Sequence, residues 1–196
     1  MDRPSKTNIG EYYNKLSRSY DELYGEEQLR KHDKVVESLG NRRFGITVDI
    51  GCGTGTLLEK LGWRCEAAVG IDVSSEMLLK AKTRLGRERA ELIRADSKAL
   101  PIRRATMDCV LAISLLDSSG ENYKAQMSEI KRIAKQQGTL ALTIFHPDDE
   151  GLKIEQFGLP PQASIEKISK IETLYVIQPT NNLGRGSSNP GLSHLL

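Results

Sequence analysis

Residues 46–55 read ITVDIGCGTG, a β-branched stretch that runs directly into a loop containing Gly51, Gly53 and Gly55. The β-branched residues of 46–50 predict a short buried strand. Glycine allows positive φ and carries no Cβ, so the backbone of such a loop can approach a ligand closely. Residues 55–61 predict a helix, and the N–H groups at a helix start favour an anionic group of a ligand. The stretch therefore predicts a strand, a ligand-binding loop and a helix.

The alternation of strands and helices continues after this loop. We expect strands at 67–72, 91–95, 107–114 and 139–145, and helices at about 75–85 and 122–134. Ser74 or Ser75 would cap the first of these helices, while Gly86 and Gly138 would end them. Residues 148–157 fit one more helix, and 163–171 and 172–178 fit two closing strands. This order predicts an α/β fold with a doubly wound sheet, mostly parallel, with an antiparallel strand near its C-terminal edge and helices on both faces.

Apolar and aromatic residues precede the sheet at steps of three and four. They predict an amphipathic helix over 7–24 and a second helix over 26–39, closed by Gly40. At 196 residues the chain is too short for two ordinary domains. We expect one domain over 1–178, with a helical cap at 1–40. The tail 179–196, rich in Asn, Gly, Ser and Pro, is expected to be disordered.

Composition excludes several classes of protein. There is no apolar run long enough for a membrane span, and residues 1–13 lack the apolar core of a secretory signal. A net charge of +2 does not indicate a nucleic-acid binder. The three cysteines Cys52, Cys65 and Cys109 lack the spacing of zinc ligands, so we expect buried free thiols, no metal site and a cytoplasmic location.

Asp72 narrows the ligand of the glycine loop. It ends the second strand about 20 residues after Gly51, the offset at which an acidic side chain meets a ribose diol. Asp72 could instead cap the helix that begins near Ser74. The spacing G-x-G-x-G differs from the G-x-G-x-x-G of dinucleotide enzymes, and the Gly-Lys-Ser/Thr of P-loop enzymes is missing. A nucleoside-containing ligand of another kind is therefore favoured.

Four segments in the correct order resemble motifs of the class I S-adenosylmethionine-dependent methyltransferases. Residues 48–55 resemble motif I, 69–78 motif II and its helix, 94–102 the adenine-binding loop and 107–114 motif IV. The similarity runs from about Glu11 to Phe145. It implies a Rossmann-like methyltransferase fold with S-adenosyl-L-methionine as the cofactor.

The resemblance also implies roles for individual residues. The methionine end of the cofactor would meet Asp49, Gly51, Gly53 and Ser114, and its ribose would meet Asp72. Its adenine would meet Val73, Met77 and Asp96, with Ser97 adjacent, and Cys52 of the loop is also expected at the cofactor. Tyr20 matches an aromatic residue that closes the site from the N-terminal helix. Asp96 could instead simply start a turn.

No residue is an obvious catalyst, because the cofactor itself supplies a reactive methyl group. Asp117 and His146 follow predicted strands and are the two candidates for a general base, although His146-Pro147 also fits a simple strand end. We expect His32 to be a solvated surface residue. The basic residues of 80–89 (Lys80, Lys82, Arg84, Arg87, Arg89) are expected to form a solvated helix face.

Three hypotheses about the function stay open. The lead-in 11–24 is similar to that of the ubiquinone- and menaquinone-biosynthesis methyltransferases, which suggests a small-molecule acceptor. The second hypothesis is an RNA or protein methyltransferase of the translation apparatus, with a small zinc-binding activator subunit as a possible partner. Residues 113–116 read ISLL and not NPPY, which argues against methylation of exocyclic base nitrogens or glutamine amides. The third, a non-catalytic cofactor-binding scaffold, fits the intact motifs poorly.

Overall fold

The computed structural model describes residues 9–86, 90–146 and 163–178. The helix expected at 148–157 and the tail 179–196 lie outside these ranges. In the described part no helix is both long and apolar enough to cross a membrane.

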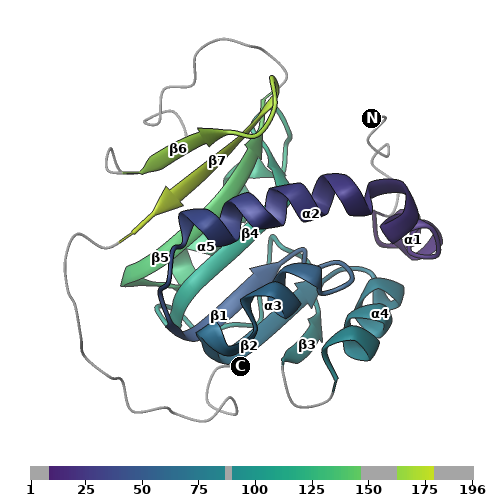
Figure 1. Ribbon diagram of the computed structural model, residues 1–196, viewed down its shortest axis with the longest axis horizontal. Coiled ribbons are helices and arrows are strands. Elements are labelled where there is room, and N and C mark those ends of the chain that lie inside the picture. The colour runs from purple at the N-terminus through teal and green to yellow at the C-terminus, as the bar shows by residue number, and fades with distance from the viewer. Residues whose placement is uncertain (1–8, 87–89, 147–162, 179–196) are drawn as a thin grey trace.

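Seven strands form one sheet in the order β3-β2-β1-β4-β5-β7-β6 (Figure 1). Their bounds are β1 Phe44–Ile50, β2 Cys65–Asp72, β3 Glu91–Arg94, β4 Met107–Asp117, β5 Ala134–Phe145, β6 Ser164–Lys167 and β7 Glu172–Ile177. Strands β1 to β5 pair in parallel, whereas β7 runs antiparallel to both β5 and β6. The α/β sheet expected from the sequence, with its one reversed strand near the C-terminal edge, is confirmed.

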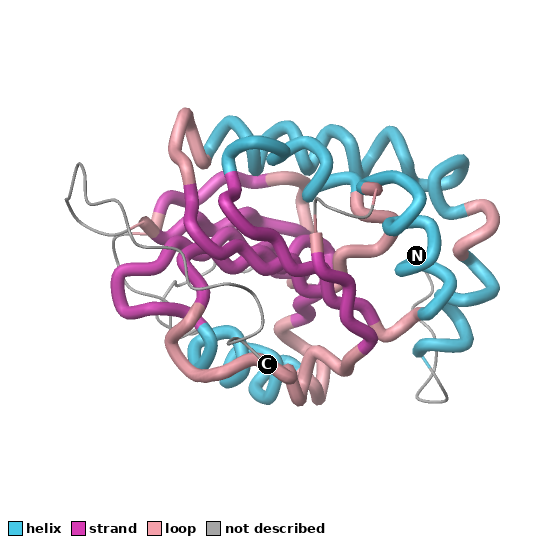
Figure 2. Tube along the Cα trace, turned by 90° about the horizontal axis from the view of Figure 1, so that it is seen from below, coloured by secondary structure: helices cyan, strands magenta, loops and turns pink. Residues whose placement is uncertain are grey.

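Helices cover both faces of the sheet, giving three layers (Figure 2). Their bounds are α1 Ile9–Leu16, α2 Tyr20–Ser38, α3 Thr56–Leu61, the short 3-10 helix Gly62–Arg64, α4 Ser75–Leu85 and α5 Tyr123–Ile133. Val35, Leu57 and Leu61 join one face of the sheet in a buried cluster, so α2 and α3 lie on that face. Met127 and Ile130 of α5 belong to the buried cluster of the other face. Helices α2, α3 and α5 thus bury apolar side chains against the sheet.

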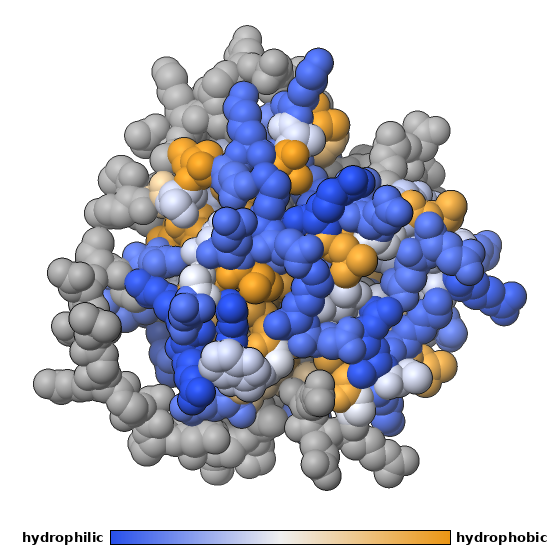
Figure 3. All heavy atoms as spheres, viewed as in Figure 1, coloured by the Kyte–Doolittle hydropathy of each residue, from blue (hydrophilic) through white to orange (hydrophobic). Residues whose placement is uncertain are grey.

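The face of the molecule that carries α2 and α3 is mostly hydrophilic, and its exposed apolar side chains lie scattered among charged ones (Figure 3). Large apolar side chains that stay exposed include Leu23, Trp63 and Leu79. Scattered exposure of this kind is normal for a protein surface. The sheet faces, and not this surface, hold the apolar core.

The strand order reverses at β1, and this places the functional site. From β1 the chain moves outward through β2 and β3 on one side, and β4 and β5 lie on the other side. In parallel sheets of this kind, ligands bind beyond the carboxyl ends of the strands at the point of reversal. The glycine loop begins at the carboxyl end of β1, so it lies at that point.

The predicted boundary between the two N-terminal helices is wrong. The break falls at residues 17–19, and α2 continues through Gly25, where the prediction had placed the gap. The hydroxyl of Ser17 donates to the carbonyl of Asn14 at 2.8 Å, a local bond that competes with helix continuation. As a result Tyr20 begins α2 and does not end the preceding helix.

The predicted start of the fifth strand is also wrong. Strand β5 begins at Ala134, directly after α5, and not at Thr139. Gly138 therefore does not end a helix. A Cβ added at Gly138 would lie 2.9 Å from the carbonyl oxygen of Lys135 and 3.2 Å from that of Met107. The glycine allows a close backbone approach at an irregular point of the β4–β5 pairing.

Candidate functional site

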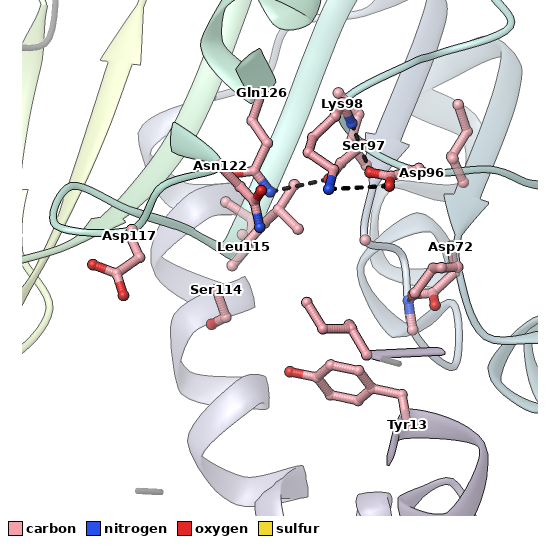
Figure 4. Close-up of a pocket in the computed structure, with 18 of the residues that line it drawn as sticks. Tyr13, Asp72, Asp96, Ser97, Lys98, Ser114, Leu115, Asp117, Asn122 and Gln126 are labelled. Carbon is pink, nitrogen blue, oxygen red and sulfur yellow. Dashed lines mark hydrogen bonds and ion pairs between the residues drawn. The ribbon is translucent and has the colours of Figure 1, made fainter. Parts of the chain in front are cut away.

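A cavity of about 580 Å³ opens at the carboxyl ends of β1, β2 and β4. Side chains from α1, from the loop after β3 and from β4 surround an open space, with Asp72 and Asp96 on one side and Ser114 on the other (Figure 4). Nine of the eleven residues that the sequence suggested for cofactor binding line it: Tyr20, Gly51, Gly53, Asp72, Val73, Met77, Asp96, Ser97 and Ser114. The other two, Asp49 and Cys52, line a smaller cavity of about 150 Å³ that shares Tyr20, Gly51 and Gly53 with the first.

The glycine loop is held in a conformation that favours glycine. Gly51, Gly53 and Gly55 have φ values of 76°, 53° and 81°. A Cβ added at Gly55 would lie 3.1 Å from side-chain atoms of Ala81 and Leu85, so this glycine allows α4 to pack closely. A Cβ at Gly53 would meet no protein atom within 4 Å. The loop therefore leaves open space beside Gly53 that a ligand can fill.

Asp72 joins the glycine loop to β2 while it faces the cavity. Its carboxylate accepts hydrogen bonds from the backbone N–H of Gly53 at 3.0 Å and of Ser74 at 2.8 Å. Burial raises the pKa of Asp72, and the bonds from Ser74 and Gly53 oppose that rise. Ser74, whose hydroxyl accepts from the N–H of Met77, is the cap of α4. The capping alternative for Asp72 is therefore wrong.

Asp49, near the end of β1, and Cys52, within the glycine loop, are both buried. Only 3% of Asp49 is exposed. Burial, followed by the charge of Asp72, raises the pKa of Asp49 to about 7. Burial is also the main cause that raises the pKa of the Cys52 thiol, so this cysteine stays a thiol at neutral pH. Asp49 is thus a carboxyl group that a nearby cation can draw into its ionised form.

The loop after β3 presents Asp96 and Ser97 to the cavity. The Asp96 carboxylate accepts from the N–H of Lys98 at 2.9 Å and pairs with the Lys98 ammonium at 3.5 Å. Gln126 of α5 donates to the Ser97 hydroxyl at 3.0 Å (Figure 4). Asp96 starts a turn, which was the alternative interpretation of this residue, and it also lines the cavity. Both sequence interpretations of Asp96 are compatible with this geometry.

Ser114 has an unusual backbone at the cavity wall. Its φ is 57°, a left-handed conformation that costs a non-glycine residue about 1–3 kcal/mol. The Thr143 hydroxyl accepts its N–H at 2.6 Å. The Ser114 hydroxyl lies 3.2 Å from the Lys31 ammonium and 3.4 Å from a carboxylate oxygen of Glu172. These contacts hold Ser114 in place.

Lys31 and Glu172 are polar residues next to the site that the sequence did not indicate. Lys31 is 7% exposed, and its ammonium lies 2.8 Å from Glu27 and 2.7 Å from Glu172. Burial lowers the pKa of Lys31, but hydrogen bonds to Glu172 and Glu27 outweigh it and leave the pKa raised. No sequence signal could have found this group, because Lys31 stands within a charged stretch and Glu172 lies far along the chain.

The two candidates for a general base differ in position. Asp117 lines the large cavity, and its carboxylate accepts from the N–H of Ser119 at 3.0 Å and from its hydroxyl at 2.8 Å. His146 lines neither cavity. It is 4% exposed, and its Nε2 lies 2.9 Å from the Thr173 hydroxyl. The structure therefore brings Asp117, but not His146, to the large cavity.

Two expectations about solvated residues are wrong. His32 is 9% exposed, and burial together with the charge of Lys60 lowers its pKa to about 4, so it is neutral at pH 7. Arg84 is not a free member of a basic face. Its guanidinium donates to Asp21 at 2.9 Å and to the Thr54 carbonyl at 2.9 Å, which joins α4 to α2 and to the glycine loop. Arg87 and Arg89 lie outside the described residues.

No group of three or more potential metal ligands occurs in the part of the chain that the structure describes. Cys52, Cys65 and Cys109 are free thiols; Cys52 and Cys109 are buried as expected, whereas Cys65 is only partly buried. Tyr20 adds an aromatic ring to the site. Burial is the main cause that raises the pKa of Tyr20, and its ring lies 5.4 Å from that of Tyr24. The site is thus built from carboxylates, hydroxyls, aromatic rings and backbone amides.

Comparison with known proteins shows similarity to methyltransferases. Residues 48–142 match the family model described as a methyltransferase domain. The chain is 32% identical over 140 residues to an uncharacterized protein of Methanocaldococcus jannaschii, covering 71% of this chain and 52% of that protein. It is 30% identical to a malonyl-[acyl-carrier protein] O-methyltransferase of Enterobacter lignolyticus, covering 64% and 49%. The chain thus spans about half the length of the curated relatives it matches.

Solved structures share the fold at low identity. The complex of DhpI with SAH superposes with a TM-score of 0.70 at 18% identity, covering 88% of this chain and 95% of that one. A structure that holds the Haloferax volcanii Trm112 methyltransferase activator in complex gives a TM-score of 0.63 at 18% identity, covering 75% and 66%. At such identities the likeness establishes the fold alone.

Proposed function

Since the chain belongs to the class I S-adenosylmethionine-dependent methyltransferases, we propose that its large cavity binds S-adenosyl-L-methionine and that the chain transfers the methyl group to an acceptor. One observation carries this proposal: Asp72 and Gly53 are joined by a hydrogen bond at one wall of the cavity. The carboxylate that we propose for the ribose diol thus meets the glycine loop where the strand order reverses.

The residues present fit this cofactor. The cavity volume of about 580 Å³ lies within the ~300–1,000 Å³ of small-molecule sites. The open space at Gly53 suits the methionine end, with Asp49 available to its ammonium. The carboxylates of Asp72 and Asp96 have acceptor capacity left for the ribose hydroxyls and the adenine amino group. Tyr20 would close the site from α2, while Val73 and Met77 border the adenine.

When bound, the cofactor supplies an electrophilic methyl group, so that an acceptor lone pair forms the new bond while sulfur keeps the electrons of the old one. The residues of this chain need only hold the two reactants in line and exclude water. Such positioning contributes up to about 7–11 kcal/mol. Asp117 lines the cavity at the end of β4 and would take a proton from an acceptor there.

For the acceptor we favour a small molecule. The relative that methylates malonyl-[acyl-carrier protein] points to an oxygen acceptor on a small acyl group, and the similarity of residues 11–24 to quinone-biosynthesis enzymes points to a quinone-like one. Side chains that would meet the acceptor include the aromatic Tyr13 and Tyr123 and the apolar Leu115. A cytoplasmic location remains a prediction from cysteine usage.

A second candidate function is methylation of an RNA or protein of the translation apparatus with an activator subunit. The structural neighbour that contains the Trm112 activator favours it. Strand β3 stands at the edge of the sheet. Co-expression with a small zinc-binding activator subunit tests this alternative: a higher affinity for the cofactor would support it, and an unchanged affinity would favour the small-molecule acceptor.

Calorimetric titration with S-adenosyl-L-methionine tests the proposed cofactor. We expect saturable binding by the wild-type chain and a loss of about tenfold or more in Asp72→Asn, because the variant loses the charge that faces the ribose. Glu66→Gln is the matched control, since Glu66 is an exposed carboxylate on the same strand. Absence of binding by the wild-type chain would contradict the proposal.

A further inference from the structure

Strand β4 is irregular where it passes the large cavity. Residues 112–116 of β4 lie opposite residues 142–144 of β5, so β4 advances by four residues where β5 advances by two. The residues between the paired ends are Ile113, Ser114 and Leu115, which we call the β4 bulge. All three line the large cavity. Bulges next to active sites direct side chains toward them. The irregular segment therefore forms this part of the cavity wall.

The β4 bulge lies beside the glycine loop. A Cβ added at Gly51 would lie 3.4 Å from Cδ1 of Leu115, so the Leu115 side chain packs against this glycine. Ile113 lines the smaller cavity as well as the large one. Ser114 and Leu115 lie across the open space from Asp72 (Figure 4). A shift of the β4 bulge would therefore change the space between two walls of the large cavity.

Two contacts hold Ser114 in its left-handed conformation. Its N–H donates to the Thr143 hydroxyl at 2.6 Å, and its own hydroxyl accepts from the Lys31 ammonium at 3.2 Å. Thr143 is fully buried and lies on β5 opposite the β4 bulge. A φ of 57° is unfavourable for serine, so it persists only where the surrounding structure imposes it. The Thr143 hydroxyl supplies an acceptor at the point where the regular pairing of the two strands is interrupted.

We propose that Thr143 is a positioning residue, whose hydroxyl fixes the β4 bulge in the shape that the cofactor site requires. This inference rests on the proposed function, because it concerns the same cavity. Thr143 lines neither cavity, so it acts through Ser114. Without the hydroxyl, the Ser114 N–H loses its acceptor and the backbone can relax to a negative φ. That relaxation turns the peptide and moves the β4 bulge relative to Gly51.

Thr143→Val tests this role, because valine keeps the β-branched shape but replaces the hydroxyl by a methyl group. Non-bonded heavy atoms pack at about 3.5–4.0 Å. The added methyl carbon therefore cannot lie 2.6 Å from the Ser114 nitrogen, as the hydroxyl oxygen does, and the β4 bulge must move. We expect the affinity for S-adenosylhomocysteine, measured by calorimetry, to fall about tenfold or more.

A conservative variant and a matched control accompany Thr143→Val. Thr143→Ser keeps the hydroxyl and should retain an affinity within about threefold of the wild-type value. Thr139→Val is the control, because Thr139 is a buried threonine of the same strand that lines neither cavity. We expect wild-type affinity in this control. A crystal structure of Thr143→Val should show a negative φ at Ser114.

The outcomes separate this inference from the proposed function. Wild-type affinity in Thr143→Val, or a φ of Ser114 that stays positive there, would overturn the inference and leave the proposed function intact. An equal loss of affinity in Thr143→Ser or in Thr139→Val would overturn it too. If Thr143→Val does not fold, Thr143→Ala removes the hydroxyl without adding a methyl group beside Ser114 and carries the same expectations. Failure of the wild-type chain to bind S-adenosylhomocysteine would overturn the proposed function and this inference with it.

Discussion

At Gly53, both the backbone conformation and the open space of the cavity favour a glycine. Its φ of 53° strains any other residue, and a Cβ there would enter open space at the cavity. We expect Gly53→Ala to lose about 1–2 kcal/mol of unfolding free energy and to weaken cofactor binding about tenfold or more. Urea denaturation and calorimetry measure the two effects.

Gly40→Ala is the control for this variant. Gly40 has a φ of 61°, and a Cβ there would also meet no atom within 4 Å, but the residue lies at the far end of α2. We expect a similar loss of stability with no change in cofactor affinity. Wild-type affinity in Gly53→Ala would contradict the placement of the ligand beside this loop.

Asp49 should make stability depend on pH. Its pKa is raised from an ordinary value of 3.8 to about 7, so the stability associated with this group is complete below about pH 4 and is lost as the pH rises through 7. Asp49→Asn removes that loss. We expect the variant to match the wild-type chain at pH 4 and to exceed its unfolding free energy at pH 8 by a few kcal/mol, at about 1.4 kcal/mol for each pKa unit.

Asp49→Asn should bind the cofactor less well at pH 8, because the neutral amide cannot form an ion pair with the cofactor's ammonium. Urea denaturation at the two pH values, with calorimetry at pH 8, checks both effects. An equal loss of stability at pH 4 and pH 8 would show that Asp49 has a packing role independent of its charge. In that case the pKa account of this residue fails.

At the scale of elements, Arg84 holds α2 against the glycine loop. It donates to Asp21, the neighbour of Tyr20, and to Thr54 in the loop. Arg84→Met should lose about 1–3 kcal/mol of unfolding free energy and weaken cofactor binding, because both Tyr20 and the loop lose support. Lys82→Met, an exposed residue of the same helix, should change stability by less than about 0.5 kcal/mol. Equal effects of the two variants would contradict this role.

The elements themselves were largely predictable, because strands and helices leave local patterns. The β-branched stretch before Gly51 and the serine cap of α4 needed no tertiary information. The break after Leu16 coincides with a bond from the Ser17 hydroxyl to the Asn14 carbonyl, and the apolar periodicity of the sequence runs through it unchanged. The early start of β5 depends on the pairing of Ala134 with Met107, a contact between distant segments. Local patterns could not predict either feature.

At the scale of the whole molecule, the sequence predicted the side of the site that the glycine loop and Asp72 form better than the side near Ser114. Residues of the glycine loop and Asp72 follow strand ends directly, so strand order alone brings them together. Lys31 reaches Ser114 only because α2 packs across the sheet beside β7. His32 was misjudged for the same reason, since its charged sequence neighbours hide its burial.

The most direct test of the central claim is a crystal structure of the chain with S-adenosylhomocysteine. We predict the ribose hydroxyls within hydrogen-bond distance of the Asp72 carboxylate, the adenine beside Asp96 and Met77, and the amino-acid end next to Gly51 and Gly53. A ligand bound elsewhere, or bound in this cavity without contact to Asp72, would contradict the account.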